Sequence, residues 1–574
     1  MPVQPAVESV VAQPLRAPRR PSRAEVCATV VDFERARRER GLTPTQAARE
    51  LGVPRSTLRD WIARTRGGSL TPGQRAFFET PDGLVLLRSL LVAALFVMNL
   101  CGGLGVAMVR AFFTHAGLDE LIACSETSLR RTRRAMITAI GAWGDAQDRE
   151  LARTMPRKDI LACVDENFHA AMMLVAMEPV SGMLLVERYA TRRDGATWAG
   201  ALREATTVWP VRLLALVGDE AKGLIRCARE HLGVLKGSDL FHVQHEITRG
   251  VAGTVGRMVR QAERDLDTAR ADRETVCADR RAWAQTRHGP GRPPDFDTRE
   301  AVAAQAVTDA AAALETAQRH RDELRAAVRD LGDRYHPVDL ATGAMQTAES
   351  VEERLLEGFE RIWDRAVSAG LGDRSARVCT AIAKAQRVVP SLAAMVAWWH
   401  RTVSERLAAL SLTTQETAWV MGSLLPVMYL DRVAARGADK DTRERLRALR
   451  DRLRASLDAA GSPWETWSAA RRTAVRLVVQ GCVDLFVRAS SCVEGRNGQL
   501  SLHHHRTQRL PNDLLRALTV IHNYALKRAD GTTAAERFSG RKHDDLFAHL
   551  LTLAPMPARP RVRRRSERPP LLAA

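Results

Sequence analysis

The chain contains few lysines and no closely spaced cysteine pair, and each absence narrows the classes of protein to consider. Only seven of the 86 basic residues are lysine, so arginine carries almost all of the positive charge. Nine cysteines are scattered over 574 residues without a Cys-x-x-Cys pair. This pattern argues against a zinc ribbon and against a disulfide framework, and we expect a protein of the reducing cytoplasm.

The sequence also lacks a clear targeting or membrane segment. Residues 1–23 are rich in Pro and Arg without an uninterrupted apolar core, which favours a disordered basic arm over a signal peptide. Ser89 to Val109 is free of charge over 21 residues, the length of a membrane span. Because Asn99 and the pair Gly102 and Gly103 interrupt it, we expect two buried helices joined at the glycines. A membrane-attached regulator is the alternative interpretation.

A strong positive charge is the main compositional feature. The formal net charge is +19 and the isoelectric point is about 10.4. Such a balance indicates an anionic partner, and nucleic acid is the usual one. Arginine-favouring codon usage is the alternative explanation.

Residues 24–66 carry the pattern of a helix-turn-helix. Thr43 can cap a helix that begins at Pro44 and ends before Gly52, and Pro54 opens a second helix. Two short helices joined in this way form a DNA-binding helix-turn-helix. The alternative is a helical hairpin with a solvated arginine face.

The N-terminal end of the second helix would contact bases in the major groove of double-stranded DNA. The residues predicted to do so are Arg55, Ser56, Thr57 and Arg59. The following region, 67–150, is expected to be helical, and its arginine cluster near residue 130 is either a second DNA-binding helix or a solvated face.

After residue 150 the apolar pattern changes from helical to strand-like. Three apolar runs, a helical stretch, a fourth run, a second helix and a fifth short run follow within 151–250. This order is that of a ribonuclease-H-like sheet, so 151–250 is predicted to form the first part of an α/β core. Asp165 is expected to close the first strand, Asp219 to close the fourth, and Asp239 to lie on the fifth.

The first and fourth strands of such a sheet are neighbours, so Asp165 and Asp219 would lie side by side. Two acids without a basic partner repel, and a divalent cation is the usual reason for keeping them together. A third acid from a helix would complete a site for two Mg²⁺ ions that holds a phosphodiester in line. Glu494, in Val-Glu-Gly-Arg-Asn-Gly, is the candidate. The alternative is that Asp165 and Asp219 are plain turn acids.

Polar residues around these acids receive supporting roles. Arg496 is interpreted as a phosphate clamp and Asn497 as an amide donor in reach of the same spot, both of them as DNA contacts. His503 and Arg506 are expected to face the DNA backbone. A zinc site at His503–His505 is the alternative. Asp239 is expected to orient the site. His242 could bind metal, but a structural or phosphate-facing role is preferred.

The rest of the chain is predicted to be helical. The expected parts are an antiparallel coiled-coil hairpin at 251–334, an all-helical insertion at 335–489, the last part of the catalytic core at 490–550 and a disordered basic tail at 551–574. The predicted fold class is thus a mostly helical α+β multidomain protein. It would contain an N-terminal helix-turn-helix and a ribonuclease-H-like core interrupted by a long helical insertion.

Four motifs in this order resemble the DDE transposases of bacterial insertion sequences. They are VDENF, GDEAKGL, SDLFHVQHE and Ser-x-x-Val-Glu-Gly-x-Asn, and the likeness covers roughly 160–250 and 490–550. The family's Asn ahead of Val-Glu-Gly is Ser491 here, and the basic run that follows is His-rich rather than Lys-rich.

The resemblance implies a transposase that binds the ends of its element and then hydrolyses and rejoins phosphodiesters. It implies Asp165, Asp219 and Glu494 as catalytic ligands of Mg²⁺ or Mn²⁺. The expected partners are double-stranded DNA and further copies of the chain, with no membrane, and the expected location is the nucleoid in the cytoplasm. The alternative is a decayed or domesticated transposase that only binds DNA.

Overall fold

The computed structural model describes residues 20–66, 70–168, 171–287, 289–371, 376–437, 439–505 and 509–553. Most of the predicted N- and C-terminal arms and Arg506 lie outside these residues. The chain divides into two compact units. The first is Met1–Gln147 with Asp513–Ala525 and His543–Ala574, and the second is Asp148–Asn512 with Leu526–Lys542.

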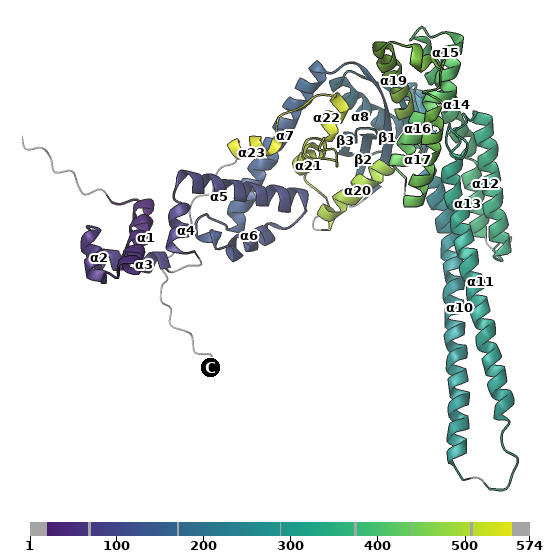
Figure 1. Ribbon diagram of the computed structural model, residues 1–574, viewed down its shortest axis with the longest axis horizontal. Helices are drawn as coiled ribbons and strands as arrows, with labels where there is room; N and C mark the ends of the chain where they lie inside the picture. The colour runs from purple at the N-terminus through teal and green to yellow at the C-terminus, as the bar shows by residue number, and fades with distance from the viewer. Residues whose placement is uncertain are drawn as a thin grey trace, which may run out of the picture. The chain divides into compact units, whose positions relative to one another are not determined.

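The first unit begins with three helices that form a helix-turn-helix. They are α1 (Arg23–Arg40), α2 (Pro44–Glu50) and α3 (Arg55–Arg66) (Figure 1). Thr43 caps α2 as predicted, because its hydroxyl accepts the N–H of Gln46 while the Gln46 side chain accepts the N–H of Thr43. Gly52 has φ +64° in the turn, a conformation that favours glycine. Phe33 and Leu58 are among the buried residues that hold the three helices together.

The charge-free stretch of the first unit forms helices separated by glycines, as expected. After α4 (Pro72–Phe77) come α5 (Pro81–Ala93), a π-helix (Ala94–Cys101) and α6 (Val106–His115), with Gly103 at φ +69° between them. Among the described residues, Pro81–Cys101 is the one helix long and apolar enough to cross a membrane, and 44% of its most apolar window is buried. A single helix of this kind is weak evidence for a span, because core helices have the same composition.

The C-terminal segments of the first unit correct one predicted boundary. Trp143 of α7 (Glu126–Thr154) packs edge-on against Tyr524 of α21 (Asn512–Tyr524), with ring centroids 5.2 Å apart. The helix α23 (Leu546–Leu553) lies in the same unit. Part of the segment 490–550, predicted to finish the catalytic core, therefore packs with the N-terminal helices, because its apolar face fits α7.

The second unit contains one five-stranded sheet with the order β3-β2-β1-β4-β5. Its strands are β1 (Lys158–Phe168), β2 (Met172–Glu178), β3 (Met183–Tyr189), β4 (Val211–Gly218) and β5 (Leu235–Ser238). β1 to β3 form an antiparallel meander, whereas β4 runs parallel to both β1 and β5. The prediction that the first and fourth strands are neighbours is confirmed.

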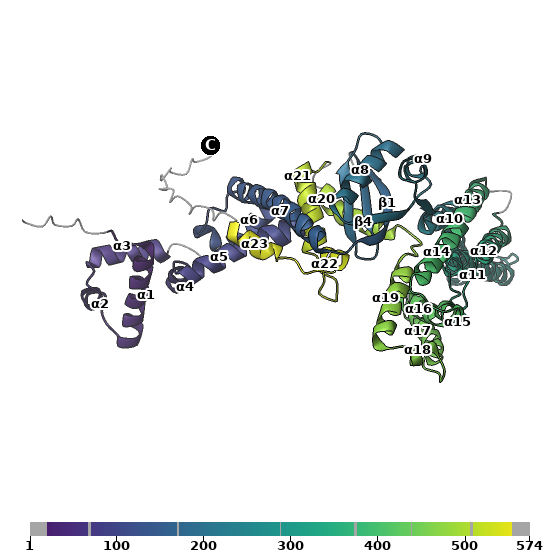
Figure 2. The ribbon, with the colours of Figure 1, turned by 90° about the horizontal axis from the view of Figure 1, so that it is seen from above.

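One face of the sheet is covered by α8 (Gly195–Val208), whose Trp198 is fully buried against Val164 and Leu216 (Figure 2). A short helix, α9 (Lys222–Arg226), and a π-helix (Cys227–Leu232) connect β4 to β5. These elements share one continuous apolar core with β1 and β4.

A helical hairpin follows directly after the sheet. α10 (Leu240–Gln285) and α11 (Phe296–Arg334) lie side by side in both views (Figures 1 and 2). At 1.5 Å per residue, the 46 residues of α10 span about 70 Å. Ion pairs cross the hairpin from Arg280 to Asp297 at 3.0 Å and to Glu300 at 2.7 Å. The predicted hairpin started at 251, but its first helix begins eleven residues earlier, at Leu240.

The rest of the insertion consists, within the described residues, of helices and their connections, with one isolated bridge between Val338 and Met345. Trp399 is fully buried there and donates its indole N–H to the carbonyl of Cys482 at 2.8 Å, so it anchors two helices. The insertion packs on the sheet, where Arg406 lies 2.8 Å from Asp159 of β1. Its helices are α12 (Ala348–Ser368), α13 (Ala376–Gln386), α14 (Val389–Ala408), α15 (Thr414–Trp419), the π-helix Val420–Leu424, α16 (Leu425–Ala435), α17 (Lys440–Ala455), α18 (Pro463–Thr466) and α19 (Ala469–Asp484).

The chain returns to the sheet at α20 (Ser491–His504), which packs on β1 and β2. The short helix α22 (Ala534–Ser539) then packs against β3. The insertion therefore separates two parts of one folded unit.

Candidate active site

The helix α20 is held on the sheet by a buried ion pair. The guanidinium of Arg496 contacts the carboxylate of Glu187 on β3 through two hydrogen bonds of 2.7 and 2.8 Å. The two side chains are 5% and 0% exposed. The predicted phosphate clamp at Arg496 is wrong, because this side chain points into the fold and its charge is already paired.

The same helix brings Glu494 to Asp165 of β1. The possible ligand atoms of Asp165, His242 and Glu494 all lie within 4.8 Å of one another. Asn497, one turn after Glu494, directs its Nδ2 at Oδ2 of Asp165 at 3.5 Å, across 332 positions of sequence. Asn497 therefore faces the acids rather than a DNA surface, contrary to its predicted role as a DNA contact.

The sequence predicted that Asp165 ends its strand, but β1 continues to Phe168. Its position inside the strand buries the carboxyl group. Burial, the main cause, raises its pKa from 3.8 to about 7, and the charges of Glu494 and Asp219 act in the same direction. The backbone N–H of Glu166, which donates to Oδ1 at 2.8 Å, opposes this rise.

Asp219 immediately follows β4, as predicted, but it is not a member of the 4.8 Å group. Its Oδ1 accepts the N–H of Ala221 at 3.1 Å, which holds the carboxylate in the turn before α9. The charge of Asp219 nevertheless contributes to the raised pKa of Asp165. The structure thus brings two of the three predicted acids together and leaves the third in their electrostatic range.

Asp239 is not on the fifth strand, because β5 ends at Ser238 and Asp239 is the N-cap of α10. Its buried carboxylate accepts the N–H of Phe241 at 2.7 Å, and it accepts both the N–H and the hydroxyl of Ser490. Ser490 is in turn the N-cap residue of α20. We call this contact the Asp239–Ser490 clasp; it joins the starts of α10 and α20, and the role of Asp239 in orienting the site stays a prediction.

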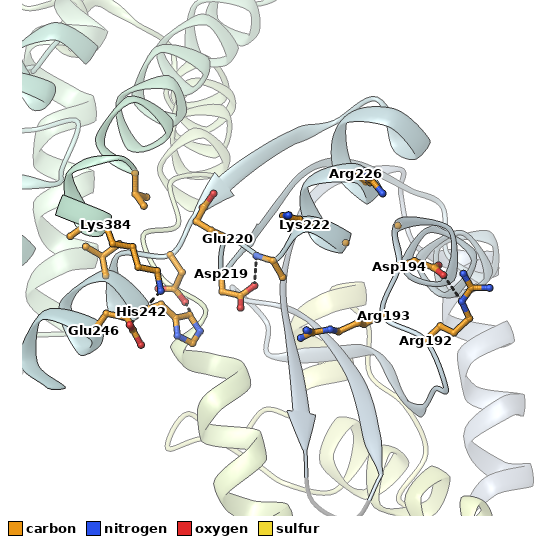
Figure 3. A pocket seen from close by; sticks show the side chains of 17 residues that line it. Arg192, Arg193, Asp194, Asp219, Glu220, Lys222, Arg226, His242, Glu246 and Lys384 are labelled. Carbon is orange, nitrogen blue, oxygen red and sulfur yellow. Dashed lines mark hydrogen bonds and ion pairs between the residues drawn. The ribbon is translucent and has the colours of Figure 1, made fainter. Parts of the chain in front are cut away.

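A pocket of about 810 Å³ lies beside the acids. Asp219 and His242 line it, and Lys384 of α13 reaches it from the helical insertion (Figure 3). The pocket is lined by both charges. The cations are Arg192, Arg193, Lys222, Arg226 and Lys384, and the acids are Asp194, Asp219, Glu220, Asp239 and Glu246. Arg192 is paired with Asp194, and Lys384 with Glu246.

Sequence reasoning missed these pocket residues, since they come from loops and helices far apart in the chain. The small number of lysines in the sequence could have pointed to some of these residues. Lys222 and Lys384 line the pocket. Lys236 is buried behind the lining residue Glu220, with which it pairs, and it donates to the carbonyl of Gly218 at 2.9 Å. Three of only seven lysines therefore gather at this site.

The predicted DNA-reading side chains of α3 are accessible. Arg55, Ser56 and Arg59 are exposed, and Thr57 is half-buried. His503, predicted to face the DNA backbone, is half-buried in the last turn of α20.

Two segments of the chain match known families. Residues 34–72 match a family described as "Homeodomain-like domain", and residues 420–566 match "Family of unknown function (DUF6399)". The chain has a homeodomain-like helix-turn-helix. This domain supports DNA binding, whereas the second match, which includes Glu494, carries no activity in its description. No curated protein matches the chain.

Proposed function

We propose that this protein is a DDE-type transposase, which cleaves and rejoins DNA with a ribonuclease-H-like core and a divalent metal. The observation that carries the proposal is the meeting of Asp165 and Glu494. One residue precedes the long helical insertion in the sequence and the other follows it. The fold places their possible ligand atoms within 4.8 Å of each other. The sheet order, with an antiparallel meander followed by two parallel strands, fits the ribonuclease-H-like interpretation.

The residues fit a divalent cation. Asp165 and Glu494 would hold it, with Asp219 at the edge of the site. The charged groups that act most on the pKa of Asp165 are Glu494, His242 and Asp219. A divalent cation bound there supplies positive charge that stabilises the attacking and leaving oxygens of a phosphodiester.

Cations in the lining of the pocket support a DNA strand as the substrate. Lys222 lines the pocket and could neutralise a phosphate of a backbone that enters it, whereas Lys384 is already paired with Glu246 at 3.4 Å. Arg193 contributes a third cation and also pairs with Glu166 at 3.2 Å. These side chains would position the strand so that a phosphodiester faces the acids.

The helix-turn-helix would supply recognition of the element ends. The exposed side chains at the start of α3 are of the kind that reads bases, whereas the pocket cations bind backbone without sequence preference. A homo-oligomer that brings two DNA ends together would use one surface to recognise the ends and another to hold the strand that is cut. A protein with this task acts at the nucleoid.

The test is metal-dependent nicking of a supercoiled plasmid that carries the gene with its flanking DNA. We expect Asp165→Asn and Glu494→Gln to abolish nicking while DNA affinity stays within about twofold, since affinity comes from basic surfaces. Glu204→Gln is the matched control, because Glu204 is an exposed acid of α8 paired with Arg188.

Unchanged nicking by both site variants would overturn the proposal. If the unmodified protein binds the flanking DNA but does not nick it with any divalent metal, a protein that only binds DNA is the better description.

A further inference from the structure

His242 has an unusual environment for a surface-proximal histidine. It lies in the first turn of α10, and its Nε2 is buried without a hydrogen-bond partner. Its closest acid is Asp239, whose Oδ2 is 3.7 Å from Nε2, beyond hydrogen-bond range. Because Asp239 already accepts hydrogen bonds from Phe241 and Ser490, it does not need the imidazole as a donor.

The Asp239–Ser490 clasp explains why His242 meets Glu494. His242 follows Asp239 by about one helical turn, and Glu494 follows Ser490 by about one turn. Since the two helix starts are joined at the clasp, the side chains one turn further along converge. Asp165 of β1 lies opposite both of them, within 4.8 Å.

The atoms that converge here are suited to a cation. Two carboxylates and an imidazole nitrogen can each offer a lone pair. Oδ1 of Asn497 is also buried without a partner, while its Nδ2 is directed at Asp165. A Lewis acid satisfies such a set of acceptors, whereas another hydrogen-bond acceptor or an anion does not.

We infer that His242 is a direct metal ligand and that it makes Mn²⁺ the preferred ion over Mg²⁺. This inference rests on the proposed function, because it concerns the same metal site. Mg²⁺ favours oxygen ligands and a near-ideal octahedron, whereas transition metals accept imidazole nitrogen readily. A site with one nitrogen and two carboxylates therefore binds Mn²⁺ more tightly than an all-oxygen site would.

The test is Mn²⁺ and Mg²⁺ binding by calorimetry, with pulsed EPR of bound Mn²⁺ to detect coupling to a ¹⁴N nucleus. We expect ¹⁴N coupling in the unmodified full-length protein and its loss in His242→Gln. We also expect the Mn²⁺ affinity of that variant to be lower by about 100-fold. Removing a residue that only orients a ligand lowers metal affinity by about 10- to 100-fold, so a direct ligand should cost at least the upper value. Mg²⁺ affinity should change much less.

His245→Gln is the matched control. His245 is exposed on the same helix, and its ring stacks on the ring of Phe241. Its ¹⁴N coupling and metal affinities should equal those of the unmodified protein. His242→Asn provides a second variant should the Gln variant not fold.

The outcomes separate this inference from the proposed function. Mn²⁺ binding without ¹⁴N coupling, or equal losses for Mn²⁺ and Mg²⁺ in His242→Gln, would overturn the role of His242 and leave the carboxylate site in place. Failure of the unmodified protein to bind either ion would overturn the metal site itself.

Discussion

Arg496 and Glu187 form a buried, bidentate ion pair that fastens α20 to β3. The helix that carries Glu494 is thus positioned by a charge pair next to the candidate active site. Removing one partner of such a pair leaves the other charge buried without this counter-charge, which is far more costly than replacing both.

Arg496→Ala is accordingly expected to destabilise the fold by about 3–5 kcal/mol. The joint replacement Glu187→Leu with Arg496→Met should restore most of that loss, since both charges of the pair are then absent. Thermal and urea unfolding measure both effects. Arg188→Ala, at the exposed pair with Glu204, is the control and should cost at most about 1 kcal/mol. Equal losses at the two arginines would contradict the positioning role of Arg496.

The Asp239–Ser490 clasp gives a second prediction. Ser490→Ala removes the hydroxyl that donates to the buried carboxylate and should destabilise the fold by about 1–3 kcal/mol. It should also weaken Mn²⁺ binding, because His242 and Glu494 each lie one turn beyond the clasp. Ser491→Ala is the control, since Ser491 is exposed and is the next residue of the helix. A stability loss with unchanged metal affinity would show that the clasp does not set the ligand geometry.

Metal binding should depend on pH through Asp165. Burial and the nearby acids raise its pKa to about 7, so this carboxyl group is mostly protonated at pH 6 and mostly ionised at pH 8. A cation requires the ionised form, and its affinity should therefore be roughly tenfold weaker at pH 6 than at pH 8. Calorimetric titrations at several pH values measure this. Asp165→Asn should bind metal weakly with a much flatter pH profile, and an equally steep profile in that variant would assign the dependence to another group.

The recognition helix gives a prediction that is independent of the metal site. Arg59 is exposed near the start of α3, so Arg59→Ala should reduce the preference for the element's ends by about 1–3 kcal/mol. Arg64→Ala is the matched control, because Arg64 is exposed on the same helix but further from its N-terminal end. Competition binding with flanking and unrelated DNA separates the cases. A uniform loss on all DNA would mean that Arg59 contacts only phosphate.

Local patterns in the sequence were sufficient where short-range physics determines the structure. The cap at Thr43 and the left-handed turn at Gly52 depend on interactions within a few residues. The helix-turn-helix could therefore be predicted from its local sequence. The neighbouring position of β1 and β4 followed from the order of apolar runs, because few connections between strands are sterically possible. Asp165 and Glu494 could be selected because their motifs, VDENF and Val-Glu-Gly-x-Asn, resemble those of DDE transposases.

Side-chain direction was decided only by the tertiary fold. The sequence assigned both Arg496 and Asn497 to DNA, yet one pairs with Glu187 and the other faces Asp165. Which face of a helix packs on a sheet depends on every contact along it, and adjacent residues differ by about 100°.

His242 shows the same limit at the site itself. The sequence left its role open and placed Asp239 on a strand, but a helix that begins one residue later turns His242 toward Glu494. The contact also requires α20, which the chain reaches only after the whole helical insertion. Composition and local pattern therefore determined the kinds of elements and the candidate acids. The long-range packing of α10 and α20 decided which side chains share the site, because their approach is fixed by buried contacts between distant segments.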